Sequence, residues 1–170
     1  YNLDSEKLVC VAGGKDRNGT IFNIIRHIKE NFGVDDDDVV VTHDSVRPFV
    51  TSRIIEENID AALDFGACDT VISATDTIVM SENGSMITNI PNRKFMYQGQ
   101  TPQSFKINLL FDLYNDLSDE EKAVLTDACK ICVVRNYPVH LVAGEVSNMK
   151  ITTVTDYKIA MAMVGGIKVD

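Results

Sequence analysis

The chain has 170 residues, of which 45% are hydrophobic and 24% are charged, as is ordinary for one globular domain with a real core. Sixteen basic residues stand against twenty-five acidic ones, and the net charge of −9 argues against a nucleic-acid-binding surface. The hydrophobic runs are too short to cross a bilayer, which argues against a membrane partner. An anionic small molecule would therefore have to be drawn in by a local basic pocket.

The four cysteines, at positions 10, 68, 129 and 132, predict free thiols rather than a disulfide framework. A chain of this length with so few cysteines is typical of a reducing cytoplasm. Cys129-x-x-Cys132 is the one close pair, so zinc or redox chemistry is the alternative. It has no second pair and no suitably spaced histidines, which favours buried thiols.

The chain begins with a predicted strand, a turn and a helix. Residues 8–11 form the strand, and hydrophobic residues recur at helical spacing from Ile21 to Phe32 until Gly33. The turn at residues 13–20 presents backbone N–H groups and a helix N-terminus, which favour an anion or a ligand edge. A tight turn without a ligand would have the same composition. Neither the Walker spacing nor the third glycine of a dinucleotide fingerprint is present.

The central motif is T-H-D-S-V-R-P-F, at residues 42–49. It follows residues 35–38, an acidic run predicted to be a solvated loop rather than a calcium site, and a buried strand at residues 39–41. Ligands of open α/β sheets bind outside the carboxyl ends of the strands. Asp44 and Arg47 would there serve a metal and an anionic oxygen, or would instead pair with each other and cap a helix.

The middle of the chain adds a helix, a strand and a hairpin. The helix begins at Thr51 or Ser52 and ends at Gly66, and residues 70–74 predict a strand. Short β-prone runs at 77–80 and 85–90 flank Asn-Gly, the strongest short hairpin signal. We expect residues 75–97 to form an arm that covers a site or pairs with a second subunit.

The last part of the chain continues the alternation. Residues 100–103 precede a hydrophobic run, and the capping box at residues 118–121 begins a short helix. Further strands are predicted at 131–134 and 139–142, and a final helix is capped by residues 153–156. Residues 1–170 are thus expected to form a single α/β domain with a mostly parallel sheet. Taken singly, Arg93 could be an ordinary exposed arginine, and the pattern around Lys150 favours a surface lysine.

The order and spacing of these motifs resemble those of the cytidylyltransferases that act on polyol phosphates. The motifs are G-G-K-D-R-N-G-T, H-D-S-V-R-P, D-T-I, N-R-K-F-M-Y-Q-G-Q-T-P-Q-S-F, L-T-D-A and N-M-K-I-T, and they span essentially the whole chain. Two enzymes of this kind act on 2-C-methyl-D-erythritol 4-phosphate and on ribitol 5-phosphate. The motifs T-H-D-S-V-R-P-F, Y-Q-G-Q-T-P-Q and L-T-D-A-C-K-I resemble those of the ribitol 5-phosphate enzyme more than those of the methylerythritol enzyme.

The resemblance implies a Rossmann-like nucleotidyltransferase that works as a homodimer. The implied reaction transfers CMP from CTP to ribitol 5-phosphate with Mg²⁺, giving CDP-ribitol and pyrophosphate for teichoic acid and cell wall biogenesis. The alternative acceptor is 2-C-methyl-D-erythritol 4-phosphate, in isoprenoid synthesis. Two non-catalytic alternatives are a module that binds CTP without releasing pyrophosphate and a dimerisation unit that is indifferent to nucleotide.

The resemblance also assigns roles to individual residues. Thr77 and Arg93 match arm residues that reach the neighbouring subunit's site, and Asp44 matches the strand-end position near the ribose and the magnesium. Lys15 stands where the methylerythritol branch commonly has an acid. The residues expected to bind the nucleotide are Gly13, Gly14, Lys15, Thr20 and Ser45. Those expected to bind the substrate phosphate or to be catalytic are Asp44, Arg47, Thr77, Arg93, Thr101 and Lys150.

One family motif is absent. Family members begin with L-x-x-G-G-x-G-x-R and a P-K pair, which cradle the triphosphate, and this chain begins Y-N-L-D without them. We therefore expect roughly two βα units, about 60 residues, to precede Tyr1 in a longer protein.

Overall fold

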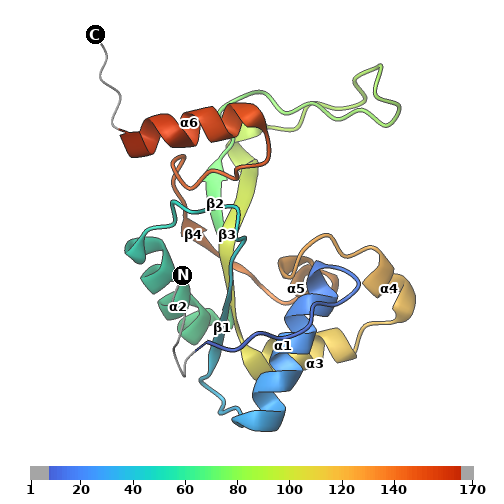
Figure 1. The fold of residues 1–170 in the computed structure, drawn as a ribbon. Helices are drawn as coiled ribbons and strands as arrows, with labels where there is room; N and C mark the ends of the chain where they lie inside the picture. The colour runs from blue at the N-terminus through green and yellow to red at the C-terminus, as the bar shows by residue number, and fades with distance from the viewer. Residues whose placement is uncertain (1–7, 166–170) are drawn as a thin grey trace.

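The computed structural model describes residues 8–165. Its centre is a four-stranded sheet with the strand order β1-β3-β2-β4 (Figure 1). β3 pairs antiparallel with both β1 and β2, whereas β2 and β4 pair parallel. The sheet is therefore mixed, and the expectation of a mostly parallel sheet was wrong. The four strands are β1 (Val39–Thr42), β2 (Ala67–Ser73), β3 (Tyr97–Lys106) and β4 (His140–Ala143).

β3 runs in the direction opposite to that expected for the sheet, and the sequence analysis did not predict it as a strand. It carries Pro102 and several polar side chains, so it lacks the hydrophobic run of a central strand. The pairing register of β2 and β3 shifts between Asp69 and Val71, which accommodates the missing N–H of the proline. At this irregularity the hydroxyl of Thr70 donates to the Pro102 carbonyl at 2.6 Å. A buried hydrogen bond thus replaces part of the regular ladder.

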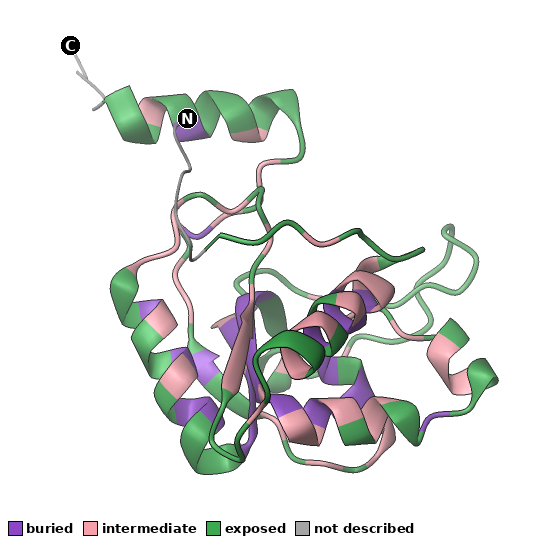
Figure 2. Ribbon diagram, turned by 60° about the horizontal axis from the view of Figure 1, so that its bottom comes forward, coloured by how far each residue is buried: buried purple, intermediate pink, exposed green. Residues whose placement is uncertain are grey.

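Helices cover both faces of the sheet. On one face, α1 (Arg17–Asn31), α3 (Ile107–Asn115) and α5 (Cys129–Val134) pack around Phe105, which is fully buried (Figures 1 and 2). On the other face, α2 (Ser52–Phe65) packs its alanines against β2 and β4. The predicted start of α2 is confirmed, since Thr51 caps it, whereas α1 begins at Arg17, capped by Asp16, within the segment that was predicted to be a turn.

Two predicted strands are not strands. Residues 131–134 belong to α5, in which Cys129, Ile131 and Cys132 are buried while Val133 is exposed. This one-sided burial suits a helix on the sheet and outweighs the β-propensity of valine and isoleucine. Residues 8–11 form no strand, and Leu8 and Val9 are half exposed, because none of the described strands pairs with them.

The expected arm projects from the body, but it is not a two-stranded hairpin (Figure 1). Between residues 75 and 97 a single β-bridge joins Met80 and Asn89, followed by the short 3₁₀ helix η1 (Arg93–Phe95). Asn83 and Gly84 make the turn, and the Asn83 side chain accepts from the backbone of Ser85 at 3.0 Å. The hydrophobic side chains of the segment are largely exposed. They therefore provide no packing that would hold the two runs together in a longer β-ladder.

Two helices complete the described chain. α4 (Asp119–Ala123) has the predicted capping box between Ser118 and Glu121. α6 (Val154–Gly165) lies at one end of the sheet, and of its residues only Ala160 is buried (Figure 2). Among residues 8–165, none of these helices has the length and hydrophobicity needed to cross a membrane.

Candidate phosphate-binding site

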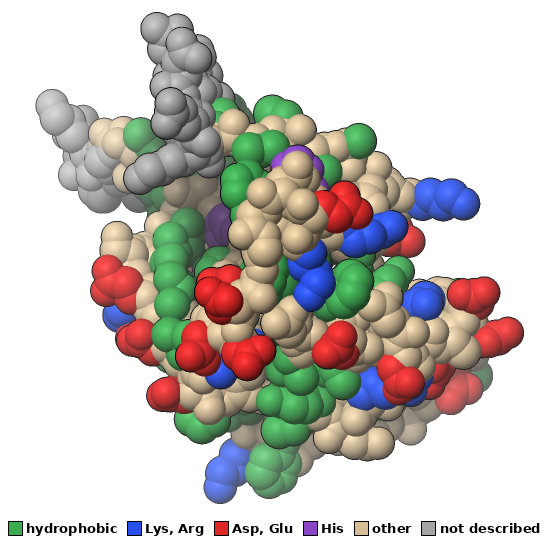
Figure 3. Space-filling view, turned by 90° about the horizontal axis from the view of Figure 1, so that it is seen from below, with side chains coloured by type: hydrophobic (Ala, Val, Ile, Leu, Met, Phe, Trp, Pro, Cys, Tyr) green, Lys and Arg blue, Asp and Glu red, His purple; other side chains and the backbone are tan. Residues whose placement is uncertain are grey.

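Three cations from different parts of the fold lie within 4 Å of Asp44. Acidic and basic side chains are likewise mixed on the face of the molecule that Figure 3 shows. Asp44 follows β1, as does Arg47, while Arg17 begins α1 and Lys150 lies in the loop between β4 and α6. Arg17 Nη2 is 3.7 Å from Asp44 Oδ1. Arg47 Nε and Lys150 Nζ are 3.5 Å and 3.1 Å from Asp44 Oδ2. Of the two sequence-based alternatives, the pairing of Asp44 with Arg47 is observed, and the pair belongs to a larger cluster. The binding of a metal by Asp44 and of an anionic oxygen by Arg47 stays a prediction.

The charges of this cluster keep Asp44 ionised. Burial alone would raise the pKa of its carboxyl group, but the hydrogen bond and charge of Lys150, with the charges of Arg17 and Arg47, hold the pKa below its usual value of 3.8. One carboxylate therefore faces three cations. Within this cluster the cations outnumber the anion, although Asp127 lines the same hollow and Asp69 lies behind Gln103. The three cations make this a place where an anionic ligand can be bound in an otherwise acidic protein.

Thr101 joins β3 to the loop after β1. Its hydroxyl accepts from the Asp44 N–H at 3.0 Å and lies 3.0 Å from His43 Nδ1. His43 Nε2 lies 2.8 Å from the carbonyl of Arg47, which can only accept. The Nε2–H tautomer satisfies all three contacts, because Nδ1 then accepts the hydroxyl proton of Thr101. The loop that carries Asp44 and Arg47 is thereby held against the sheet.

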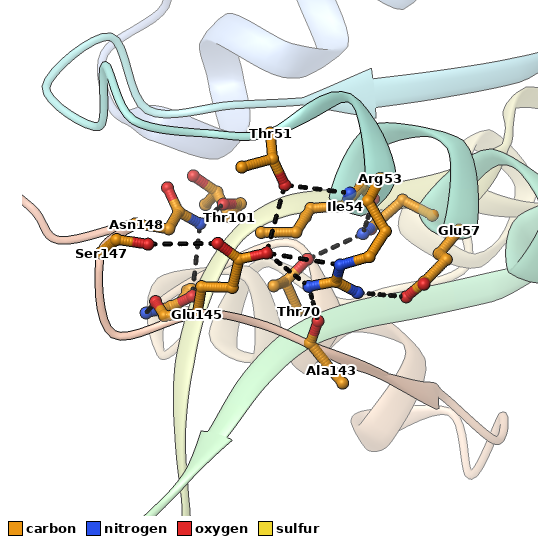
Figure 4. A network of polar contacts seen from close by, with 12 residues as sticks. Thr51, Arg53, Ile54, Glu57, Thr70, Thr101, Ala143, Glu145, Ser147 and Asn148 are labelled. Atoms are coloured by element: carbon orange, nitrogen blue, oxygen red, sulfur yellow. Dashed lines mark hydrogen bonds and ion pairs between the residues drawn. The ribbon is translucent and has the colours of Figure 1, made fainter.

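The loop that carries Lys150 is held by a second network (Figure 4). The carboxylate of Glu145 accepts from Arg53 Nη2 at 2.9 Å and from Ser147 Oγ at 3.1 Å. The side-chain amide of fully buried Asn148 donates to the Thr101 carbonyl at 2.8 Å. The backbone carbonyl of Asn148 accepts from Arg47 Nη1 at 2.8 Å. These contacts tie the loop to α2, to β3 and to the loop after β1. Lys150 is therefore delivered by a fixed segment.

Two hollows adjoin the cluster, with volumes of about 360 and 190 Å³. The larger hollow is mostly hydrophobic and runs along β1 beside α1. The smaller one is polar and lies over the strand ends. Among their lining residues, Arg17 and Asp44 are common to both. The other principal lining residues are Thr20, Ile21, Ile24, Val40 and Ser45 in the larger hollow and Arg47, Thr101, Gln103, Asp127 and Lys150 in the smaller one.

Of the five residues predicted to bind the nucleotide, two line the larger hollow and three lie in the turn before α1. Thr20 and Ser45 line the hollow. Gly14 donates its N–H to Thr20 Oγ1 at 2.9 Å, and a Cβ atom on Gly14 would lie 2.3 Å from the Gly19 carbonyl carbon. Only glycine fits this close approach of two backbone segments. Gly13 and Lys15 are exposed in the same turn.

The two arm residues do not join the cluster within one subunit. Thr77 and Arg93 are exposed and line neither hollow. Arg93 Nη1 instead donates to the carbonyl of Thr75 at 2.8 Å, at the base of the arm. Whether a second subunit brings them to a site stays a prediction.

Three residues that the sequence analysis missed are part of the site. Arg17, Gln103 and Asn148 contact the cluster or its loops, and Asp69 and Asp127 lie beside it. Arg17 immediately follows Asp16, the N-cap that the structure shows, and it lies in the motif G-G-K-D-R-N-G-T between a predicted strand and a helix, which was a usable signal. Gln103 and Asn148 gave none, because their roles depend on strand pairing.

The described residues contain no group of three or more His, Cys, Asp and Glu side chains that would hold a metal ion. Asp44 is the one candidate metal ligand, with Asp127 lining the same hollow. Such a set suits Mg²⁺ that is held mainly by the phosphates of a ligand.

The three-layer α/β fold and the position of the Asp44 cluster are those of the α/β proteins that bind their ligands outside the carboxyl ends of the strands. The family model for IspD, described as 2-C-methyl-D-erythritol 4-phosphate cytidylyltransferase, matches residues 2–166. The chain therefore belongs to the IspD family, whose members are cytidylyltransferases, a kind of nucleotidyltransferase.

Solved structures agree. The 2-C-methyl-D-erythritol 4-phosphate cytidylyltransferase from Thermus thermophilus is 27% identical, with a TM-score of 0.76 over 91% of this chain and 72% of that one. The 4-diphosphocytidyl-2C-methyl-D-erythritol synthase from Anaerococcus prevotii is 28% identical, with a TM-score of 0.74 over 90% and 68%. The Francisella tularensis cytidylyltransferase, at 23% identity and a TM-score of 0.83 over 94% and 73%, shares the fold. None of these matches supports the expected preference for ribitol 5-phosphate.

Proposed function

We propose that this protein transfers CMP from CTP to 2-C-methyl-D-erythritol 4-phosphate and releases pyrophosphate. The observation that carries the proposal is the convergence of Arg17, Arg47 and Lys150 on Asp44 in a chain of this family. The family model and the similar structures favour this acceptor over ribitol 5-phosphate.

The reaction brings two polyanions together. An oxygen of the acceptor phosphate bonds to the α-phosphorus of CTP, and the bond to the β-phosphate breaks with its electron pair leaving on pyrophosphate. Catalysis of this kind depends on positioning and charge neutralisation rather than on a covalent enzyme intermediate. Arg47 and Lys150 are proposed to hold the acceptor phosphate in the smaller hollow, with Thr101 fixing the loop of Asp44.

The larger hollow is proposed to hold the cytidine of CTP. It combines hydrophobic walls with the hydroxyls of Thr20 and Ser45. Gly13, Gly14 and Lys15 form the adjoining turn at the start of α1, where backbone N–H groups favour a polar ligand edge. Mg²⁺ would be held by Asp44 and the nucleotide phosphates, and when bound it neutralises charge on the transferred phosphate.

The arm is proposed to serve a homodimer. Thr77 and Arg93 line neither hollow of their own subunit and lie on a projecting segment with exposed hydrophobic side chains, as is expected if they complete the site of a partner. Residues 8–165 otherwise form one α/β unit, which supports a single catalytic domain.

The test is a coupled pyrophosphate assay with CTP, Mg²⁺ and either acceptor. We expect faster release with 2-C-methyl-D-erythritol 4-phosphate than with ribitol 5-phosphate. The sequence motifs T-H-D-S-V-R-P-F and Y-Q-G-Q-T-P-Q favour the opposite order, so a higher kcat/KM for ribitol 5-phosphate would make ribitol the substrate. Saturable CTP binding without release from either acceptor would establish a non-catalytic module.

A further inference from the structure

Arg17 is the cation that the two hollows have in common. The other residue that lines both hollows is Asp44, which is an anion. The guanidinium of Arg17 lies 3.7 Å from Asp44 Oδ1, whereas Arg47 and Lys150 approach the other oxygen, Oδ2. Its side chain remains about one-third exposed, so it can meet a ligand. A group that belongs to both hollows at once would therefore lie against Arg17.

The orientation of Arg17 is fixed from the sheet. Arg17 Nη1 donates to Gln103 Oε1 at 3.2 Å, and Gln103 Nε2 donates to Asp69 Oδ1 at 3.0 Å. Gln103 is only 2% exposed, so its amide has few alternative partners. The guanidinium can only donate, which turns the amide oxygen toward Arg17 and the amide nitrogen toward Asp69. Asp69 on β2 and Gln103 on β3 thereby anchor a side chain that belongs to α1.

We propose that Arg17 is a further catalytic residue, which binds the phosphate at the junction of the two hollows, and that Gln103 and Asp69 are positioning residues that hold it there. The proposal rests on the proposed function, in which this phosphate is the α-phosphate of CTP. A new bond forms between an acceptor oxygen and the α-phosphorus while the bond to the pyrophosphate oxygen breaks. Arg17 transfers no proton in this step. Its planar guanidinium stabilises the negative charge on the non-bridging oxygens.

The experiment compares Arg17→Ala with Arg26→Ala, which removes the same charge from another position of the same helix that lines neither hollow. We expect Arg17→Ala to lower kcat by about a hundredfold or more and Arg26→Ala to leave it within about twofold. The kcat of Arg17→Lys should fall between those of the two alanine variants, since an ammonium keeps the positive charge but lacks the planar, two-pronged donor geometry of a guanidinium. Equal thermal unfolding of the variants shows that each one is folded.

Gln103→Met tests the anchor. It should lower kcat by about tenfold, and the double variant with Arg17→Ala should be no slower than Arg17→Ala alone, because Gln103 acts through Arg17. Independent roles would give multiplied losses. Multiplied losses would overturn the positioning role of Gln103, and wild-type turnover of Arg17→Ala would overturn the whole proposal.

A binding measurement separates this proposal from the proposed function. Calorimetry with inorganic phosphate, without an acceptor, reports on a single phosphate group at the junction even if no turnover is detected. Weaker binding by Arg17→Ala than by Arg26→Ala supports an anion-binding Arg17 when the transfer reaction itself fails. Equal binding by the two variants, or no binding by the wild type, overturns it.

Discussion

The ammonium of Lys150 lies 3.1 Å from Oδ2 of Asp44, although one residue follows β4 and the other follows β1. The ends of these two strands meet because both run in the same direction on either side of the β3–β2 pair. We predict that Lys150→Ala lowers kcat/KM by about a hundredfold, since a positioned cation facing phosphate is lost.

The control for this change is Lys158→Ala, which removes an exposed lysine from α6. It should leave kcat/KM near the wild-type value. A carbonyl-carbon NMR titration of Asp44 gives a second check, because loss of Lys150 should raise the pKa of that carboxyl group. An unchanged Asp44 pKa would contradict the contact.

Glu145 and Glu57 both bind Arg53, but only Glu145 belongs to the loop that carries Lys150 (Figure 4). We predict that Glu145→Ala raises KM for the acceptor phosphate by about threefold to tenfold, because the loss of its hydrogen bonds to Arg53 and Ser147 loosens the loop that carries Lys150. Glu57→Ala removes a surface pair and should change KM little. Hydrogen exchange at residues 144–151 should quicken in the first variant; equal exchange in both would show that Glu145 does not restrain the loop.

Burial raises the pKa of Asp69 to about 6, with the Asp127 charge adding to the effect and the Gln103 hydrogen bond opposing it. The folded protein thus keeps a proton that the unfolded chain releases near pH 4. Stability from this group is lost as the pH rises from about 4 to about 6, by at most about 3 kcal/mol.

Asp69→Asn keeps an acceptor for Gln103 and removes the titration. We predict that the variant becomes more stable relative to the wild type as the pH rises from 4 to 7, in urea unfolding measured at each pH. A constant difference between the two proteins across this range would contradict the raised pKa.

Arg93 is predicted to act in a partner's site. Arg93→Ala should lower turnover strongly without unfolding the dimer. Mixing it with inactive Asp44→Ala under subunit exchange should then restore activity, since a mixed dimer has one site with neither defect; about a quarter of all sites would be intact in a random mixture. Dimer content is followed by light scattering. Absence of any restoration in mixed dimers would remove Arg93 from the neighbouring site.

The cysteines give an inexpensive test of the fold. Burial raises the pKa of the Cys68 thiol to about 11 and that of Cys132 to about 12, and it raises the pKa of Cys129 further. Cys10 is exposed. We predict that iodoacetamide at a pH of about 7.5 labels Cys10 alone in the native protein and all the thiols in urea, as mass spectrometry would show. Rapid native labelling of Cys129 would contradict its place in the core.

Short local sequence motifs predicted the positions of several residues of the site. The hydrophobic run Val39–Thr42 followed by an acid and an arginine predicted both the strand and the position of Asp44 and Arg47, since a few consecutive residues decide where a buried strand ends. Thr101 and Lys150 came from the resemblance to a family, and they do lie in the same hollow as Asp44. The capping residues of α2 and α4 were equally readable, because a cap is a contact within one turn.

Sequence alone predicted the family, the caps of α2 and α4, three of the four strands and the place of Asp44 at a strand end. Only the tertiary structure decided that polar β3 is central and antiparallel, that residues 131–134 are helical, and that Arg17 is anchored through Gln103 to Asp69. The physical reason is distance along the chain. A cap or a strand end depends on near neighbours, whereas the pairing of β3, the one-sided burial of α5 and the anchoring of Arg17 depend on groups that meet only after the sheet has formed.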